Sequence, residues 1–415
     1  MVKLKNKNVF CEILQYIFVI IIILECNSVY SQIYGYHLMI RSIMTVIASG
    51  CIFFQIILKK IKIYKSLFVL IIYDVICSII MFINTDNLSG KGIVVLDFLL
   101  FLPLMLIYIS NLTKKEFRNL LQKFINVVIF LSIISLVFWI SILVFKLKPT
   151  GTVKLVWAQP YSLIPSYYNL YFNTQDVWWI TGTSLMRNTG IFAEAPMYAA
   201  ILISALIFNN ILDFENTKSN LIKTIILFIT MITTISVTGI ICSIIIIASN
   251  IKKYILAMRK NYREVFISLL LIVIICMIPL SYNFLLKKMN TASANHRNMD
   301  IKIGMETFFE KPLIGYGINH ERATELEYEN GYGYSNTIIP VITDGGIVLC
   351  IIYIFPIFLL IINGIKRRKA NYLMFSLIYM ILLFTTLIQY RLIMMLLISI
   401  GYYLAHNDYF IEGEK

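Results

Sequence analysis

The stretch from Leu221 to Leu256 reads LIKTIILFITMITTISVTGIICSIIIIASNIKKYIL, and its division decides how often the chain crosses a membrane. A membrane-spanning helix needs about 20 apolar residues. This stretch is too long for one such helix, and Thr238 and Gly239 interrupt it near the middle. Two short spans, near 221–236 and 239–256, fit it better.

Charge placement also favours two spans here. With two helices, the turn that holds Lys252 and Arg263 lies on the same side of the membrane as the basic cluster from Lys366 to Lys369. A single helix would put these groups on opposite sides, whereas Lys and Arg concentrate in cytoplasmic loops. The split therefore agrees with the distribution of positive charge.

The composition places the whole chain in a membrane. Of 415 residues, 59% are hydrophobic and 14% are charged, and the mean hydropathy is +0.80. Soluble domains carry roughly 25% charged residues, so a soluble enzyme of this length is excluded. The net charge of +14 indicates basic cytoplasmic turns rather than binding of nucleic acid.

These features predict an all-α polytopic membrane protein with about twelve transmembrane helices and both termini in the cytoplasm. The chain, residues 1–415, would form a single integral membrane domain. The expected spans are near 9–26, 38–58, 66–84, 92–110, 124–145, 191–212, 221–236, 239–256, 265–286, 337–362, 371–387 and 390–405.

Two long polar segments, 146–190 and 287–335, face outward in this topology. Connections longer than about 15 residues are usually functional or disordered. Neither segment has the composition of a flexible linker, so we expect both to be at least partly folded.

The first outer loop is rich in aromatic residues, among them Trp178 and Trp179. They fit an interfacial aromatic belt or a platform on which sugar rings stack, and the two interpretations are compatible. The loop ends at Arg187-Asn-Thr-Gly190-Ile-Phe192-Ala-Glu194-Ala-Pro196, where the next helix begins. Glu194 precedes an uncharged span, and ionisable groups at such a depth indicate function.

The second outer loop contains His296 and Arg297, followed by a predicted amphipathic helix from Asp300 to Lys311 that lies along the outer leaflet. Pro312 ends this helix. The glycines of the following Pro-Leu-Ile-Gly-Tyr-Gly sequence, Gly315 and Gly317, permit a tight turn.

These two segments resemble the signatures of one superfamily of bacterial membrane proteins. Arg187, Gly190 and Phe192, followed by Glu194, are similar to the large-loop motif of polysaccharide polymerases of the Wzy type. The segment from Arg297 to Gly317 is similar to the second motif of the same superfamily, which also contains the O-antigen ligases. Members resemble this chain in having about a dozen spans and two functional outward loops.

The resemblance implies glycosyl transfer on the outer face of the bacterial cytoplasmic membrane. Donor and acceptor would be oligosaccharides on undecaprenyl pyrophosphate, and the product a capsule, O-antigen or exopolysaccharide. Membrane lipid, a flippase and a chain-length regulator protein would be partners, and nucleic acid would not. The chain has no D-x-D pair and no nucleotide-binding fingerprint, so we expect metal-independent chemistry without a cofactor.

A departing pyrophosphate gains negative charge, which fixed cations stabilise, and arginine grips phosphate oxygens with two donors. Arg187 and Arg297 are the first candidates. Glu194, with His296 and His320 as alternatives, is the candidate base for the acceptor hydroxyl. The remaining candidates would bind substrate: Lys302, Arg322, Trp178, Trp179, Tyr316, Asn336 and Arg391.

Arg391 has a second interpretation, because it lies alone in an apolar run, as do Arg41, Asp74 and Asp97. It could pair with Asp74 or Asp97 inside the bundle, or contact the lipid pyrophosphate near the outer leaflet.

Two departures from the superfamily pattern bear on function. Ala195 separates Glu194 from Pro196, which the motif usually joins, and Ser335-Asn336 stands where ligases have His-Asn. A polymerase is therefore favoured over a ligase. A lipid-linked oligosaccharide flippase is the main alternative, although no half-repeat of the kind common in transporters is found.

Overall fold

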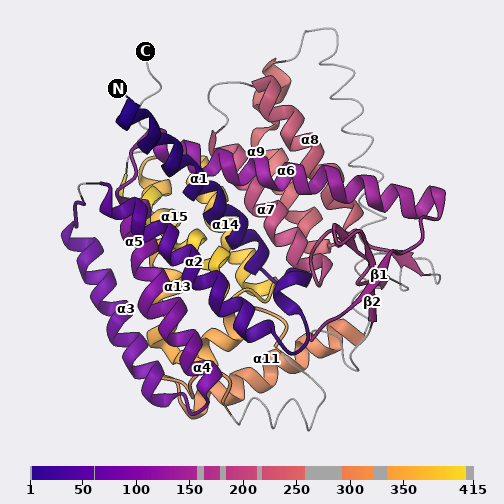
Figure 1. Ribbon diagram of the computed structural model, residues 1–415. Coiled ribbons are helices and arrows are strands. Elements are labelled where there is room, and N and C mark those ends of the chain that lie inside the picture. The colour runs from indigo at the N-terminus through magenta and orange to yellow at the C-terminus, as the bar shows by residue number, and fades with distance from the viewer. Residues whose placement is uncertain are drawn as a thin grey trace.

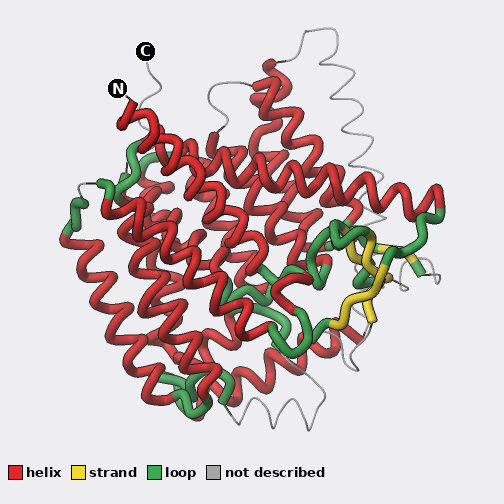
Figure 2. The backbone as a smooth tube through the Cα atoms, in the orientation of Figure 1, coloured by secondary structure: helices red, strands yellow, loops and turns green. Residues whose placement is uncertain are grey.

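The computed structural model describes residues 2–59, 61–156, 163–177, 184–212, 217–257, 292–320 and 334–407. Most of them are helical, and the few short strands gather beside the end of one long helix, α6 (Lys114–Phe145) (Figure 2). The other helices are α1 (Val2–Glu25), η1 (Val29–Gln32), α2 (His37–Ile57), α3 (Lys65–Asn84), α4 (Leu88–Ile93), the π-helix η2 (Val94–Phe101), α5 (Leu102–Ser110), α7 (Ala195–Leu212), α8 (Thr217–Thr233), α9 (Val237–Ala257), α11 (Ala292–Glu310), α13 (Ile338–Lys366), α14 (Ala370–Thr385) and α15 (Leu392–His406).

Within these residues, six helical segments are long and apolar enough to cross a membrane, judged by length and composition. They are His37–Ile57, Lys65–Asn84, Leu88–Ser110, Lys114–Phe145, Ala195–Leu212 and Ile338–Lys366. Shorter apolar helices include α14 and α15. The chain is thus a helical membrane protein. The count of twelve spans stays a prediction, and the expected span 265–286 lies outside the described residues.

The stretch from Leu221 to Leu256 is divided, as its length predicts. Helix α8 ends at Thr233 and α9 begins at Val237. The break falls slightly before Thr238, at Ile235, which adopts a left-handed backbone with φ of 51°. The carbonyl oxygens of Thr234 and Ile235 at this break accept hydrogen bonds from the side chain of Arg187 in the first outer loop.

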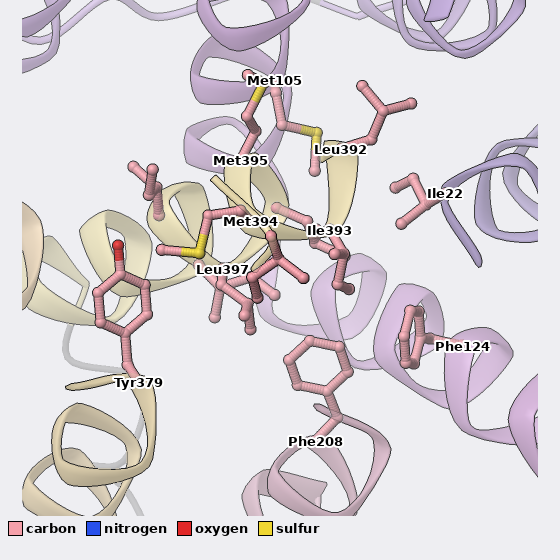
Figure 3. Close-up of a cluster of buried hydrophobic side chains, with 14 of the residues drawn as sticks. Ile22, Met105, Phe124, Phe208, Tyr379, Leu392, Ile393, Met394, Met395 and Leu397 are labelled. Carbon is pink, nitrogen blue, oxygen red and sulfur yellow. The ribbon is translucent and has the colours of Figure 1, made fainter. Parts of the chain in front are cut away.

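The bundle centre is formed by α7 and α15, which are apolar on all sides and therefore buried. In α15 every residue from Leu392 to Ala405 is buried. Figure 3 displays Met394 and Leu397 of α15 among side chains from several helices, including Phe208 of α7 and Tyr379 of α14.

The first outer loop folds into two small antiparallel sheets that the sequence did not predict. The strands are β1 (Gly151–Lys154), β2 (Leu163–Tyr167), β3 (Tyr171–Phe172), β4 (Asp176–Val177) and β5 (Leu185–Met186), in the orders β1-β2-β3 and β4-β5. The end of the loop is tied to the α1–α2 connection, since Ala193 N donates to Asn27 O (2.9 Å) and Val29 N donates to Ile191 O (2.8 Å).

The second outer loop contains the expected helix, but α11 begins at Ala292, earlier than the predicted start at Asp300. Its Ile301 and Phe309 are exposed together with Lys302 and Glu306, while Asp300 and Thr307 are buried. The surface of α11 that faces away from the protein therefore mixes apolar and charged side chains. In Figure 1 the strands and α11 lie on the side of the bundle away from the start of α1. The described parts of the two long loops therefore lie on one side of the molecule.

Candidate functional site

The motif segment, Arg187 to Pro196, connects β5 to α7 and is held by polar contacts with the α8–α9 break. Arg187 Nε donates to Thr234 O (2.8 Å), and its Nη1 donates to Gln175 Oε1 (3.2 Å). The same Gln175 oxygen accepts from Ala195 N (3.1 Å), the first residue of α7. Gln175, which the sequence analysis did not select, thus joins the motif arginine to the start of α7.

The positive charge of Arg187 is not balanced by a short ion pair. Among the residues that the structure describes, no carboxylate lies within 4.0 Å of its guanidinium, whose acceptors are carbonyl and amide oxygens. Burial lowers the pKa of Arg187 to about 10, and the charge of nearby Glu194 acts in the opposite direction. A half-buried cation held by neutral acceptors is suited to bind an anion.

The glycine of the motif has a steric role. Gly190 has φ of 56°, and a Cβ atom built on it would lie 3.1 Å from Cε1 of Tyr198. Only glycine adopts this backbone without strain beside a ring. The turn lets Phe192 stack on Tyr198, with ring centroids 5.1 Å apart.

An apolar groove opens beside this turn, between α1, α6 and α7. Its cavity volume is about 360 Å³, and its walls include Leu24, Phe130, Gly190, Phe192 and Tyr198. Two motif residues therefore line an apolar groove, while the motif arginine lies three positions earlier in the chain.

The second motif sits against a break in α13. Gly346 has non-helical backbone angles, with φ of 62°, and the Pro312–Gly317 segment pairs with the exposed backbone. Tyr316 N donates to Thr343 O (2.9 Å), Gly317 N donates to Asp344 O (2.8 Å), and Ile347 N donates to Pro312 O (2.9 Å).

The two turn glycines in this segment are required by close approach as well as by conformation. Gly315 and Gly317 have φ of 63° and 89°. A Cβ atom on Gly315 would lie 2.5 Å from the carbonyl carbon of Asp344. A Cβ atom on Gly317 would lie 2.4 Å from the carbonyl oxygen of Asn84, at the end of α3. The turn predicted at these glycines is present, and its close packing against α13 and the end of α3 leaves no room for side chains.

The break brings together a group that we call the helix-break cluster: His320, Asp344 and Tyr390. His320 Nε2 lies 3.5 Å from Asp344 Oδ1, and the Tyr390 hydroxyl donates to Asp344 Oδ2 (2.6 Å). All three side chains are buried. His320 also contacts the ring of Tyr316, with centroids 5.1 Å apart.

A second group, the ionic cluster, joins the buried Glu25 and Asp97 to the half-buried Arg41 and Arg391. Glu25 accepts from Arg391 Nη1 (3.0 Å) and lies 3.2 Å from Arg41 Nε. Arg41 also forms an ion pair with Asp97 and donates to the carbonyl oxygen of Tyr390. The partner of Arg391 is thus Glu25, not the expected Asp74 or Asp97, because the end of α1 packs beside the start of α15.

Asp74 is fully buried on α3, and the structure gives neither of its carboxylate oxygens a hydrogen-bond partner among the described residues. The pairing expected for Asp74 with Arg391 is therefore not formed.

The other predicted site residues are distributed over both loops. Arg297 is half-buried and Lys302 exposed on α11, which packs on α13. Arg187 and Arg297 are therefore held by different elements. Asn336 accepts from Ile339 N (3.0 Å) in the first turn of α13. Trp178, Trp179 and Arg322 lie outside the described residues, as does the side chain of His296 on α11.

Comparisons with protein-family models, curated proteins and solved structures find no match for this chain. The resemblance to polysaccharide polymerases consequently rests on the two sequence motifs.

Proposed function

We propose that the chain is a membrane glycosyltransferase that polymerises a bacterial polysaccharide. It transfers a growing glycan from undecaprenyl pyrophosphate to a lipid-linked repeat unit on the outer face of the cytoplasmic membrane. Twelve spans, with both termini in the cytoplasm, belong to this proposal.

The observation that carries the proposal is an arginine held by neutral hydrogen-bond acceptors in the same segment as residues that line an apolar groove. A polyprenyl pyrophosphate has an anionic head and a long hydrocarbon tail. Arg187 supplies positive charge and has no ion pair within 4.0 Å among the described residues. Three and five residues further along the same segment, Gly190 and Phe192 line the apolar groove. Both features of the lipid are therefore matched within one segment.

The same geometry suits the bond that is broken. As the bond between the anomeric carbon and the pyrophosphate oxygen stretches, negative charge grows on the pyrophosphate. A cation that is already held in place stabilises this charge without reorganisation. Arg187 is fixed by Thr234 and Gln175 and can play this part, with Glu194 beside it at the start of α7.

A lipid-linked oligosaccharide flippase is the second candidate, and the break of α13 at Gly346 favours it. Broken helices form substrate sites in many transporters. The folded first outer loop favours the polymerase, because a flippase has little use for a structured element outside the membrane.

Lipid-linked oligosaccharides from a deletion strain distinguish the two. Loss of a polymerase leaves single repeat units on the outer leaflet, whereas loss of a flippase traps them on the inner leaflet. Restoring the chain with Arg187→Lys should give at least a roughly hundredfold loss of polymer, since lysine cannot form the two-donor contact.

The matched control for this variant is Lys148→Gln, which removes an exposed cation from the same loop and should leave polymer yield unchanged. Normal polymer from Arg187→Lys, at normal protein level, would exclude Arg187 from the site.

Orientation is tested with a membrane-impermeant thiol reagent. Thr152→Cys in β1 should gain label in intact cells, while Arg368→Cys between α13 and α14 should gain label only after the membrane is opened. Both positions are exposed, so reversed labelling would place the motif segment in the cytoplasm and contradict the proposal.

A further inference from the structure

A small pocket with polar walls lies between α2 and the helical segment that α4 and η2 form together. Its volume is about 120 Å³, and its walls include Arg41, Thr45, Ser89, Gly92 and Asp97. We call it the polar pocket. In the sequence, Arg41 and Asp97 stood out only as lone charges in apolar runs, and the donor site proposed above does not use them.

The polar pocket is open because one of its walls has no side chain. A Cβ atom built on Gly92 would meet nothing outside its own helix within 4 Å. Leu38 and Leu88, which also line the pocket, are exposed, so the pocket opens at the surface. A cavity of about 150 Å³ accommodates benzene, and this pocket of similar size therefore suits a single ring.

The ion pair in the wall has hydrogen-bonding capacity to spare. Arg41 Nη2 donates to Asp97 Oδ2 and to the carbonyl oxygen of Tyr390, and its Nε lies 3.2 Å from Glu25 Oε1. Its Nη1 has no hydrogen-bond partner in the described part of the chain. There, Asp97 Oδ1 accepts only from the Thr45 hydroxyl, at 3.4 Å, although a carboxylate oxygen can accept two hydrogen bonds. One ion pair thus offers both a donor and an acceptor.

The charges around the polar pocket favour a neutral ligand. Arg41 and Asp97 are the charged residues among its described walls, and Glu25 and Arg391 bring this group to two cations and two anions. An anion in the pocket would face the carboxylate of Asp97, and its desolvation would not be repaid by an unpaired cation. A neutral group with hydroxyls can accept from Arg41 and donate to Asp97. The pocket therefore differs from the surroundings of Arg187, which suit an anion.

Backbone conformation and loop contacts also single out this place. Asp97 lies in η2, a run of π-helix, and π-helical turns are rare and frequent at functional sites. On the rim, Asn319 Nδ2 donates to Ser89 Oγ (3.4 Å), and Asn87 Nδ2 donates to the carbonyl oxygen of Asn319 (2.7 Å). Because Asn319 follows closely after Gly317, the polar pocket adjoins the end of the second motif.

The polar pocket and the apolar groove share a contact with the end of α1. Leu24 lines the groove, and the carboxylate of the adjacent Glu25 lies 3.2 Å from Arg41 Nε in the pocket wall. The two sites therefore meet the same helix end, one through each of two consecutive residues.

Resting on the proposed function, we propose that the polar pocket binds one neutral sugar residue of the lipid-linked repeat unit. A sugar ring carries hydroxyl groups at its edge and C–H groups on its faces. The hydroxyls exchange hydrogen bonds with Arg41 and Asp97, and a C–H face lies against apolar walls such as Ile93 and Leu96. The pyrophosphate is bound at Arg187, so charge and sugar are recognised at different sites.

The test fills the pocket through Gly92→Leu, which places a side chain in the open space. The purified full chain in phosphatidylcholine nanodiscs is given two ligands. One is the lipid-linked repeat unit from the deletion strain, and the other is undecaprenyl pyrophosphate, which has the same lipid and charge but no sugar. Gly92→Leu should raise the Kd of the repeat unit at least about tenfold and leave that of undecaprenyl pyrophosphate within about twofold.

The matched control is Gly50→Leu. Gly50 lies on α2 and also has open space within 4 Å, but it does not line the polar pocket. This variant should leave both Kd values within about twofold. Thr45→Val keeps the shape of the wall and removes one hydroxyl, so it should weaken binding of the repeat unit about threefold. It carries the test if Gly92→Leu lowers the amount of folded protein.

The oligosaccharide released from its lipid by mild acid shows whether the sugar itself is recognised. It should displace the lipid-linked repeat unit from the unaltered chain and displace less of it from Gly92→Leu. Equal displacement from the two chains, or none from either, overturns the inference, because the sugar then gains nothing from the pocket.

The outcomes separate this inference from the proposed function. If the unaltered chain binds neither lipid, the proposed function fails and the inference fails with it. If the chain binds both lipids and Gly92→Leu weakens neither, or weakens both equally, only the sugar site is overturned. Equal effects of Gly92→Leu and Gly50→Leu also overturn it, because the loss then does not depend on the pocket.

Discussion

Arg41 and Arg391 in the ionic cluster each contact a carboxylate within 3.2 Å, whereas Arg187 in the motif segment contacts neutral oxygens. In the cluster, the positive and negative charges cancel. Removing one partner there leaves an uncompensated buried charge. In the motif segment, Arg187 has no ion pair within 4.0 Å among the described residues, so its guanidinium can accept an anionic ligand without breaking one. The same residue type thus supports the bundle in one region and is available to bind an anion in the other.

The largest effect on stability is expected from Glu25→Gln. This change removes the carboxylate that Arg41 and Arg391 share, and should lower the free energy of unfolding by about 3 kcal/mol. Thermal or denaturant unfolding in detergent measures it. Glu116→Gln, which breaks the half-exposed pair with Lys59 (2.7 Å), should cost less than about 1 kcal/mol. Equal losses would remove the distinction between buried and exposed pairs.

An intermediate effect is expected from Gly190→Ala in the motif segment. Alanine at this position must adopt a φ of 56°, and its Cβ atom would press on the ring of Tyr198. Together these effects should lower the free energy of unfolding by about 1–2 kcal/mol. Gly151→Ala is the control, because open space surrounds that position. The same unfolding assay compares the two variants, and a neutral Gly190→Ala would show that the turn is not strained.

The smallest effect on stability is expected from Arg187→Lys, less than about 1 kcal/mol, because no ion pair within 4.0 Å is lost among the described residues and each neutral hydrogen bond contributes little. Its melting temperature should stay close to that of the unaltered chain while polymer is lost. A loss of stability as large as that of Glu25→Gln would assign Arg187 a structural role and erase the contrast between the regions.

Helix positions were predictable from apolar runs, because each run must bury its own backbone polar groups in a membrane. The break between α8 and α9 and the turn at Gly315 followed from residue type and length. The partners of the charges did not follow, since nothing in the sequence near Arg391 indicates Glu25. Glu25 could have been noticed as a carboxylate at the end of an apolar run, which indicates a paired or functional group.

The candidate site was predictable in part. Its motif residues Arg187, Gly190 and Phe192 do come together around one turn. Gln175, Asp344 and Tyr390 enter the site only through long-range packing, and single polar residues in loops give no local signal of this. The small sheets of the first outer loop were missed because their strands are only two to five residues long.

The backbone hydrogen bonds between Pro312–Gly317 and the interrupted helix α13 limit how this segment can move relative to the helix. Peeling this segment away would leave peptide N–H and C=O groups without partners in a low-dielectric surrounding, at a cost of several kcal/mol. The segment and the turns of α13 on both sides of Gly346 therefore move as one rigid body. If the chain binds a polymer as proposed, the polymer must enter by displacement at another boundary between helices, and the boundary between α6 and α7 already contains the groove.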